Sequence, residues 1–382
     1  MTDPARTYAM LAKPVSGACN LRCAYCYYAG KETLLGQGAG RMSHEVLEAY
    51  IEQSLAMHGR DAVVEFAWHG GEPTLAGLSF YEEAVRLERK HGRGRLVRNS
   101  MQTNATLLTD AWCRFFRDND FAIGVSIDGP EALHNACRKG ADGSGSFEAV
   151  MAGVRLLERH RVPFAALTTI NRFNMEHPLE VYRFLRELTD YIQFLPVVEA
   201  LPTAFEAEAG QRLATPPGIH ALGLTHPTAS FSVTPEGYGG FLCAVWDEWL
   251  GRDAGRVHVQ LFDVALGHLQ GLPSALCVHD PLCGHSGCVE ANGDVYACDR
   301  YAFPAYRLGN LTRRPLGELM EENRAFGMHK TCGLPQECLD CPYVRLCFGG
   351  CPKDRLSGGR NYLCDGYRRF FARVVADWNA GG

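Results

Sequence analysis

The chain has 382 residues, of which 46% are hydrophobic and 21% are charged, as is ordinary for a globular protein. Its formal net charge is only −5, so the sequence lacks the broad basic surface of a nucleic-acid-binding protein and predicts no nucleic-acid partner. It shows neither a signal peptide nor an apolar run of membrane-spanning length, and we therefore expect a cytoplasmic protein with no membrane partner.

Sixteen cysteines are the unusual feature of the composition. Disulfides are rare in a reducing compartment, so this excess indicates metal or cluster ligation instead. Three cysteines lie within residues 19–26 and ten within residues 277–364, with only three between these two segments. This uneven distribution predicts two ligand regions, one near each end of the chain.

From residue 7 to about residue 200, short β-rich runs alternate with amphipathic helical patterns. The strand candidates are TYAMLAKPV (7–15), AVVEFAWHG (62–70), LVRNSMQTN (96–104), FAIGVSIDG (121–129), FAALTTINR (164–172) and YIQFLPVVE (191–199). Helices are expected at 43–59, 109–120 and 177–190, and Ser43 is the predicted N-cap of the first of them. Six strand–helix units in a row predict an α/β fold in which a parallel sheet curls into a partial TIM-like (β/α)6 barrel. The polar, Gly-rich loops after these strands fall where such barrels place their chemistry.

Residues 201 to about 235 are rich in Pro, Ala, Gly and Thr and lack periodicity, which predicts a loop or linker. A helix is expected around GGFLCAVWDEWLG (239–251), and the cysteine-rich segment follows it. We therefore divide the chain into a barrel domain, residues 1–235, and a cysteine-rich domain, residues 236–382.

The first cysteine group, Cys19-x3-Cys23-x2-Cys26, directly follows the first strand candidate. Three thiolates within eight residues of loop can face a common centre, as an iron–sulfur cluster requires. Three protein ligands on a four-iron cluster leave one iron open for another molecule. The spacing alone also allows a zinc ion with a distant fourth ligand.

This cysteine motif, with the aromatic Tyr25 before its last cysteine, resembles the radical S-adenosylmethionine (SAM) superfamily, as does the GGEP stretch at 70–73. The resemblance implies that Cys19, Cys23 and Cys26 hold a [4Fe-4S] cluster whose fourth iron is chelated by SAM. It implies further cofactor contacts from Tyr25, Gly70, Gly71, Glu72, Ser126 of the SIDG stretch, Arg138 and Leu195. Glycine permits close backbone approach, and Glu72 can accept from the cofactor's ammonium group.

The C-terminal cysteines are numerous enough for two further four-ligand sites, although the CxxC at 338–341 would also suit a zinc ribbon. Their spacing resembles the SPASM extension of radical SAM enzymes. That resemblance assigns Cys277, Cys283, Cys298 and Cys351 to one auxiliary [4Fe-4S] cluster and Cys338, Cys341, Cys347 and Cys364 to another. Cys113 is expected in the core, whereas Cys288, five residues after Cys283, is a competing ligand.

Nearly the whole chain resembles the anaerobic sulfatase-maturating enzymes, through stretches such as KPVSGACNLRCAYCYY, GGEPTLAGLSFY, QTNATLLTDAWCRFF and NGDVYACDRYAFPAYRLGN. The resemblance implies oxidation of one Cys or Ser in a sulfatase motif of the C/S-x-P-x-R type to formylglycine (3-oxoalanine). A 5′-deoxyadenosyl radical would remove hydrogen from Cβ of that residue. An external low-potential electron donor of the flavodoxin or ferredoxin type is implied as a second partner.

The same resemblance implies roles for three further residues. Asp299, directly after Cys298, matches the proposed general base, and partial burial is expected to raise its pKa. Tyr28 matches a position that contacts the substrate peptide. His69 is a predicted substrate contact that stands where the family usually has glutamine. Because histidine titrates near neutral pH, we expect turnover to be pH-sensitive.

Two other functions are compatible with parts of this pattern. A SPASM-type maturase that crosslinks a ribosomal peptide through a thioether or C–C bond would share the fold, clusters and cofactor. Such enzymes commonly carry a precursor-binding module ahead of the barrel, for which we expect no room before a first strand near residue 7. A structural zinc protein or an electron carrier would need neither the GGEP and SIDG stretches nor six barrel units.

Overall fold

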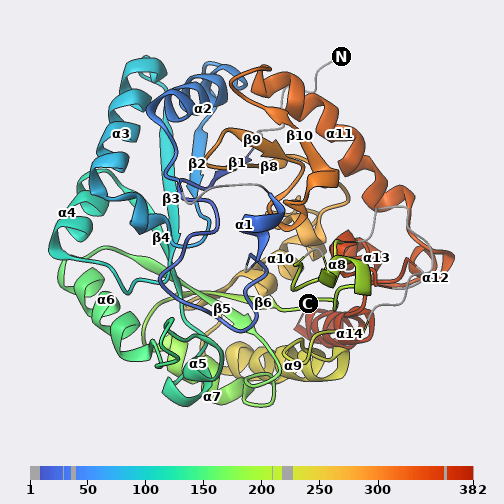
Figure 1. Ribbon diagram of the computed structural model, residues 1–382. Coiled ribbons are helices and arrows are strands. Elements are labelled where there is room, and N and C mark those ends of the chain that lie inside the picture. Colours follow the sequence, from blue (N-terminus) through green and yellow to red (C-terminus); the bar gives the residue numbers. More distant parts are fainter. Residues whose placement is uncertain are drawn as a thin grey trace.

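The computed structural model describes residues 9–28, 30–35, 40–208, 210–216, 227–356 and 359–381. All six expected strands form, and each pairs in parallel with the next along the chain. They are β1 (Ala9–Ala12), β2 (Val64–Trp68), β3 (Val97–Thr103), β4 (Phe121–Ser126), β5 (Phe164–Ile170) and β6 (Tyr191–Pro196). Helices ring this sheet on the outside (Figure 1). The predicted partial (β/α)6 barrel is therefore confirmed.

The barrel helices are α2 (His44–Ala56), α3 (Leu78–Gly92), α4 (Asp110–Asp118), α5 (Glu131–Cys137), α6 (Phe147–Arg159) and α7 (Pro178–Arg186). Ser43 caps α2 as predicted, since its side chain accepts a hydrogen bond from the Val46 N–H at 3.2 Å. Cys113 is fully buried in α4, which confirms its place in the core.

The sheet continues beyond the barrel strands on both sides. On its free side β1 pairs in parallel with β8 (Ser286–Val289), which pairs in turn with β9 (Asp294–Tyr296) and, through it, with β10 (Arg307–Asn310). The short strand β7 (His258–Val259) extends the other edge beside β6 and completes a ten-stranded sheet. This pairing brings residues of the cysteine-rich segment beside the carboxyl end of β1. The predicted domain boundary at residue 235 stays a prediction.

The remaining helices are α1 (Lys31–Leu34), α8 (Ala204–Glu208), α9 (Pro235–Arg252), α10 (Gln260–Leu269), α11 (Leu316–Cys332), α12 (Gln336–Leu339), α13 (Val344–Cys347) and α14 (Cys364–Gly381). The predicted linker thus contains the short α8, and its residues 209 and 217–226 lie outside the described residues. No helix in the described part of the chain is long and apolar enough to cross a membrane.

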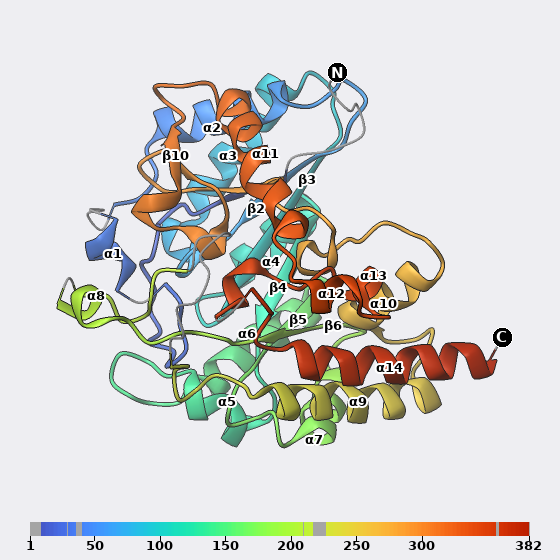
Figure 2. The same ribbon diagram turned by 90° about the vertical axis from the view of Figure 1, so that its right-hand side faces the viewer.

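The two longest helices, α9 and α14, run side by side (Figure 2). They approach closely at two glycines, because a Cβ added to Gly239 would lie 2.6 Å from the Cα of Gly366. Farther along, the Trp246 indole N–H donates to Asp377 at 2.8 Å. Since Cys364 is the first residue of α14, this contact determines where that cysteine lies relative to the barrel.

Candidate active site

The loop that carries the first three cysteines is held directly against the loop after β2. The Gly71 N–H donates to the Ser16 carbonyl and the Glu72 N–H to the Ala18 carbonyl, both at 2.8 Å. A Cβ added to Gly71 would lie 2.1 Å from the Ala18 carbonyl oxygen, and Gly70 has a φ of +120°. No larger residue fits this contact between two backbones. The two glycines therefore allow the loop after β2 to pack against the cysteine loop. This role adds to the close backbone approach that the sequence predicted for SAM.

Glu72 is buried beneath this loop, and the chain itself satisfies its carboxylate. Thr74 donates from its N–H at 3.1 Å and its hydroxyl at 2.6 Å, while Thr103 Oγ1 and the Asn104 N–H each donate at 2.7 Å. Three of these donors converge on Oε1, and the Asn104 N–H binds Oε2, so the chain supplies a donor to each oxygen. Glu72 thus ties the loops after β2 and β3 together, and its contact with the cofactor's ammonium group stays a prediction.

Tyr25 and Arg138, both predicted to contact the cofactor, meet at a third buried residue, Asp128. The Tyr25 hydroxyl donates to Asp128, and Arg138 Nε lies 3.0 Å from the same carboxylate oxygen. Burial raises the pKa of the nearby Cys23 thiol, and the positive charge of Arg138 partly opposes that rise. Ser126 and Leu195 lie at or next to the carboxyl ends of β4 and β6. The sequence-predicted cofactor residues therefore gather at the expected end of the barrel.

Asp299 lies in a short 3-10 turn, Asp299–Tyr301, and faces the end of β1. Lys13, which is fully buried, forms an ion pair with Asp299 Oδ1, and the Tyr27 hydroxyl donates to Oδ2 at 2.5 Å. Burial alone would raise the pKa of Asp299, but the Lys13 charge and these hydrogen bonds outweigh it and hold the pKa below its ordinary value. The expectation of a raised pKa is therefore wrong, because the sequence did not reveal the lysine.

Tyr28 is buried beside the same lysine. Its hydroxyl donates to Glu290, and Lys13 Nζ lies 3.8 Å from its ring centroid and 3.7 Å from Glu290 Oε1. The tyrosine therefore belongs to a buried polar network that joins the cysteine loop to the segment after β8. Its predicted contact with the substrate peptide stays a prediction.

His69 directly follows β2 and turns its ring toward its own backbone, where Nδ1 accepts from the Gly70 N–H at 2.7 Å. Burial lowers the pKa of His69, and the charge of Asp299 only partly opposes this shift. The imidazole is therefore neutral at pH 7, and the lowered pKa moves any titration toward acid pH. A substrate contact by His69 stays a prediction.

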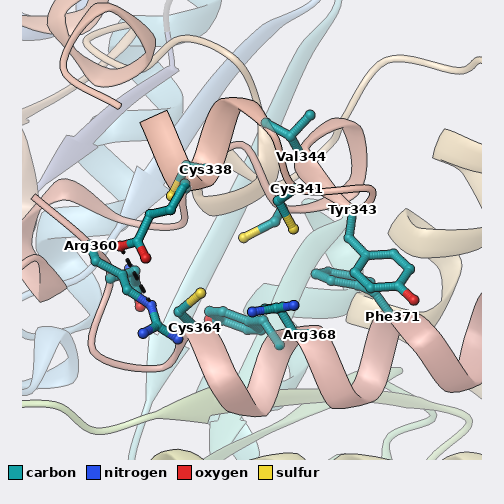
Figure 3. A pocket seen from close by; sticks show the side chains of 13 residues that line it. Cys338, Cys341, Tyr343, Val344, Arg360, Cys364, Arg368 and Phe371 are labelled. Carbon is teal, nitrogen blue, oxygen red and sulfur yellow. Dashed lines mark ion pairs between the residues drawn. The ribbon is translucent and has the colours of Figure 1, made fainter. Parts of the chain in front are cut away.

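The second set of C-terminal cysteines lines one pocket (Figure 3). Cys338 and Cys347 come from α12 and α13, Cys341 from the turn between them, and Cys364 from the start of α14. Figure 3 shows the labelled Cys338, Cys341 and Cys364 gathered around the space above the first turns of α14. This convergence supports their assignment to a common cluster.

The first set of C-terminal cysteines also converges, from four separate segments. Burial raises the pKa of Cys277, Cys283 and Cys298, and the neighbouring thiol of Cys351 raises each of them further. Cys288 is instead buried in β8 with its sulfur 3.9 Å from Glu290, beside the Lys13 network. The structure therefore favours the four-cysteine set without the competing Cys288.

Within the described ranges, no three His, Cys, Asp or Glu side chains are grouped closely enough to hold a single metal ion. A four-iron cluster binds each cysteine at a different iron, so its ligands stand farther apart than those of one zinc ion.

Two family models match the chain where these sites lie. The radical SAM superfamily model matches residues 14–185, and a model of an iron–sulfur cluster-binding domain, SPASM, matches residues 283–342. With the geometry above, these matches place the chain in the class of radical SAM oxidoreductases with a SPASM extension. SAM and [4Fe-4S] clusters are the cofactors of that class, as the sequence predicted.

Relatives identify the family within this class. A serine-type anaerobic sulfatase-maturating enzyme of Bacteroides thetaiotaomicron is 42% identical over 376 residues, covering 96% of this chain and 89% of that protein. A cysteine-type enzyme of Clostridium perfringens is 33% identical over 372 residues, or 95% of each chain. The solved structure of native anSMEcpe with bound AdoMet and Cp18Cys peptide matches with a TM-score of 0.82 at 30% identity, covering 98% of this chain and 99% of that one. The chain belongs to the family of anaerobic sulfatase-maturating enzymes.

Three residues of the site, Lys13, Tyr27 and Glu290, were not predicted from the sequence. Lys13 immediately follows β1, and the carboxyl ends of barrel strands are where functional side chains are expected, so this position carried a usable signal. No such signal marks Tyr27 or Glu290, because each binds a residue far away in the chain. Asp299 lies 272 positions from Tyr27, and Tyr28 lies 262 positions from Glu290.

Proposed function

We propose that this protein oxidises one Ser or Cys side chain of a sulfatase polypeptide, within a C/S-x-P-x-R motif, to formylglycine. The observation that carries the proposal is the position of Asp299. Its carboxylate is joined to the loop of the first cysteine group through Tyr27, and it directly follows Cys298 of an auxiliary set. A proton acceptor therefore stands between two predicted cluster sites.

The residues present fit the predicted cofactor. Cys19, Cys23 and Cys26 would hold the first cluster and leave one iron for SAM, while Gly70 and Gly71 keep the backbone beside it free of side chains. Through Tyr25, the buried pair of Asp128 and Arg138 ties this loop to the residues that follow β4 and α5. Bound there, SAM and the clusters would supply the one-electron chemistry that removes a hydrogen atom from Cβ of the target residue and accepts the electron left behind.

The chain's own part in the oxidation is to remove a proton. Loss of a hydrogen atom, a proton and an electron converts the hydroxymethyl group of serine to an aldehyde. The same losses convert the sulfanylmethyl group (CH2SH) of cysteine to a thioaldehyde, which water hydrolyses to the aldehyde and hydrogen sulfide. Asp299 is ionised at neutral pH, as an aspartate already is at its ordinary pKa of about 4, and can accept this proton. A hydroxyl or thiol beside a carbon radical is a stronger acid than the parent group, so its proton is easier to remove.

Lys13 and Tyr27 orient the base. Each binds one oxygen of the Asp299 carboxylate, so the group cannot rotate freely. An external electron donor of the flavodoxin or ferredoxin type and a cytoplasmic location are part of the proposal. They are supported by the need of cluster thiols for a reducing compartment.

The test is an anaerobic incubation of the reconstituted protein with SAM, a reductant and matched peptides that carry either Ser or Cys in the motif. Peptide products are analysed by mass spectrometry and by capture with a hydrazide reagent, which reacts with an aldehyde but not with a crosslink. We expect an aldehyde in at least one peptide. Cleavage of SAM with both peptides unchanged would reject the proposal, and a product that loses two hydrogens without hydrazide capture would favour the crosslinking alternative.

A further inference from the structure

Arg355 is a buried cation in the SPASM region that the proposed chemistry does not use. It follows Cys351 and the 3-10 turn Pro352–Asp354, and its side chain is only 5% exposed. Nη2 donates to the Lys330 carbonyl at 2.8 Å. The Nε and Nη1 donors have no hydrogen-bond partner in the part of the chain that the structure describes. Burying the donors of a charged group without acceptors costs free energy of folding. We therefore expect these two donors to bind an acceptor that is not part of the polypeptide.

The guanidinium lies close to both auxiliary cysteine sets. Its Nη2 approaches Gly349, which lines the pocket of the second set, and binds the carbonyl of Lys330, whose Nζ donates to the Cys277 carbonyl of the first set. Burial lowers the pKa of Arg355, and the thiols that oppose this shift belong to both sets, Cys351 and Cys283 to one and Cys338 to the other. In return, the charge of Arg355 lowers the pKa of Cys283 and of Cys338. A single cation therefore acts on both sites.

The surrounding packing holds the guanidinium in this position. A Cβ added to Gly349, which has a φ of +71°, would lie 2.9 Å from Arg355 Nη2 and 2.2 Å from Leu334 Cδ2. Only glycine leaves room for both side chains there. The position of the arginine is therefore fixed by the backbone next to the cysteine sets.

The other cations near the first auxiliary set have their donors occupied. Lys330 Nζ donates to three carbonyls, those of Cys277, Val278 and Asp280. Arg300 binds both oxygens of Asp354, at 3.2 and 3.0 Å. Arg355 is thus the cation of these three whose buried donors have no acceptor among the described residues.

We propose that Arg355 tunes the auxiliary clusters, with Nε and Nη1 donating to their sulfur atoms and its charge raising their reduction potentials. Both hydrogen bonds to cluster sulfur and local charge are known determinants of these potentials. A cluster with four thiolates is anionic and gains a further negative charge on reduction, so a buried cation stabilises the reduced state more than the oxidised one. The inference rests on the auxiliary clusters of the proposed function and names Arg355 as a positioning residue that makes them better electron acceptors.

The test compares the full-length reconstituted protein with Arg355→Gln, which removes the charge, and Arg355→Lys, which keeps it but loses the forked donors. Iron and sulfide are quantified first, and the clusters are then titrated against ambient potential by electron paramagnetic resonance. Signals of the first cluster are identified by their change when SAM is added. Arg345→Gln is the control, because Arg345 is an exposed arginine of the same region.

In Arg355→Gln we expect the ratio of reduced to oxidised auxiliary cluster at a given potential to be about tenfold lower. This change corresponds to a reduction potential that is about 59 mV lower for a one-electron couple. Arg355→Lys should lower the ratio about threefold, and Arg345→Gln should not change it. If Arg355→Gln does not retain its iron, the ratio measured for Arg355→Lys alone tests the inference. Wild-type ratios in an iron-replete Arg355 variant would overturn the inference. A wild-type protein with about four irons would instead reject the auxiliary clusters themselves, so the two failures are distinguishable.

Discussion

The two cysteine regions of this protein are built in opposite ways. The first group lies on one eight-residue loop, and the charges around it pair with one another, as in Lys13 with Asp299 and Arg138 with Asp128. The C-terminal cysteines come from many segments, and next to them Arg355 keeps two buried donors without a partner among the described residues. The surroundings of the first group, to which the C-terminal segment contributes Asp299, therefore provide oriented acid–base groups, whereas the C-terminal sets provide thiols and positive charge for bound anionic groups. Four sets of substitutions test this division, in order of expected effect.

Replacing one cysteine in each region should separate them most strongly. Cys26→Ala should reduce both SAM cleavage and peptide oxidation to background, since the first cluster needs all three of its protein ligands. Cys364→Ala should leave SAM cleavage measurable while peptide oxidation falls. Both are measured as 5′-deoxyadenosine by chromatography and as aldehyde product by mass spectrometry. Equal loss of SAM cleavage in the two variants would contradict the division.

Removing the base should separate SAM cleavage from product formation at the first cysteine group. Asp299→Asn keeps the shape of the side chain but cannot accept a proton, so peptide oxidation should fall about 10²- to 10⁴-fold. The rate of SAM cleavage should stay within about threefold of wild type, because no contact to the first cluster is lost. Full aldehyde formation by the variant would remove Asp299 from the mechanism.

Removing one contact to the base should have a smaller effect and a defined pH dependence. Without the Tyr27 hydroxyl, the pKa of Asp299 rises toward its ordinary value, because one donor to the ionised form is lost. Tyr27→Phe should therefore move the acidic limb of the pH profile of peptide oxidation to higher pH. It should also slow the oxidation about three- to tenfold, because the carboxylate loses the hydrogen bond that orients one of its oxygens.

Tyr182→Phe is the matched control for this variant. Its hydroxyl donates to Asp253 at 2.8 Å, where α7 packs on α9, and the substitution thus also removes one buried tyrosine–aspartate hydrogen bond. This control should leave the pH profile unchanged. Identical profiles for Tyr27→Phe and wild type would show that Tyr27 does not orient the base.

The smallest effect is expected in the helical shell, which neither region uses. Burial raises the pKa of Glu88 in α3 to about 7, and its Oε1 has no hydrogen-bond partner among the described residues. The pKa of this carboxyl is 4.5 in the unfolded chain, so between pH 4.5 and about pH 7 the folded state binds more protons than the unfolded state. The free energy of unfolding therefore decreases as pH rises over that range. Glu88→Gln should stabilise the protein above pH 7 by about 1–3 kcal/mol, and this gain should disappear toward pH 4.

Urea unfolding under anaerobic conditions at pH 5 and pH 8 measures this difference. Glu82→Gln, an exposed position on the same helix, is the control and should change stability by less than about 0.5 kcal/mol at either pH. A pH-independent effect of Glu88→Gln would contradict the assigned pKa.

The sequence by itself determined the barrel and the nature of its cofactors. Alternating hydrophobic runs located all six barrel strands, and a local capping pattern located the start of α2 at Ser43. The cysteine spacing was also sufficient for the first site, because Cys19, Cys23 and Cys26 lie on one loop whose geometry depends on nearby residues. Such features could be predicted because they depend on neighbours in the chain.

Only the tertiary structure decided the electrostatics of the site. The parallel pairing of β8 with β1 places Asp299 against Lys13 and Tyr27, and the resulting charge contact reverses the direction expected for the pKa of Asp299. The position of Arg355 beside Lys330 and Gly349, close to both cysteine sets, likewise depends on segments that are brought together by the fold. Coulomb interactions depend on distance in space and on local burial, neither of which is encoded in the spacing of residues along the chain.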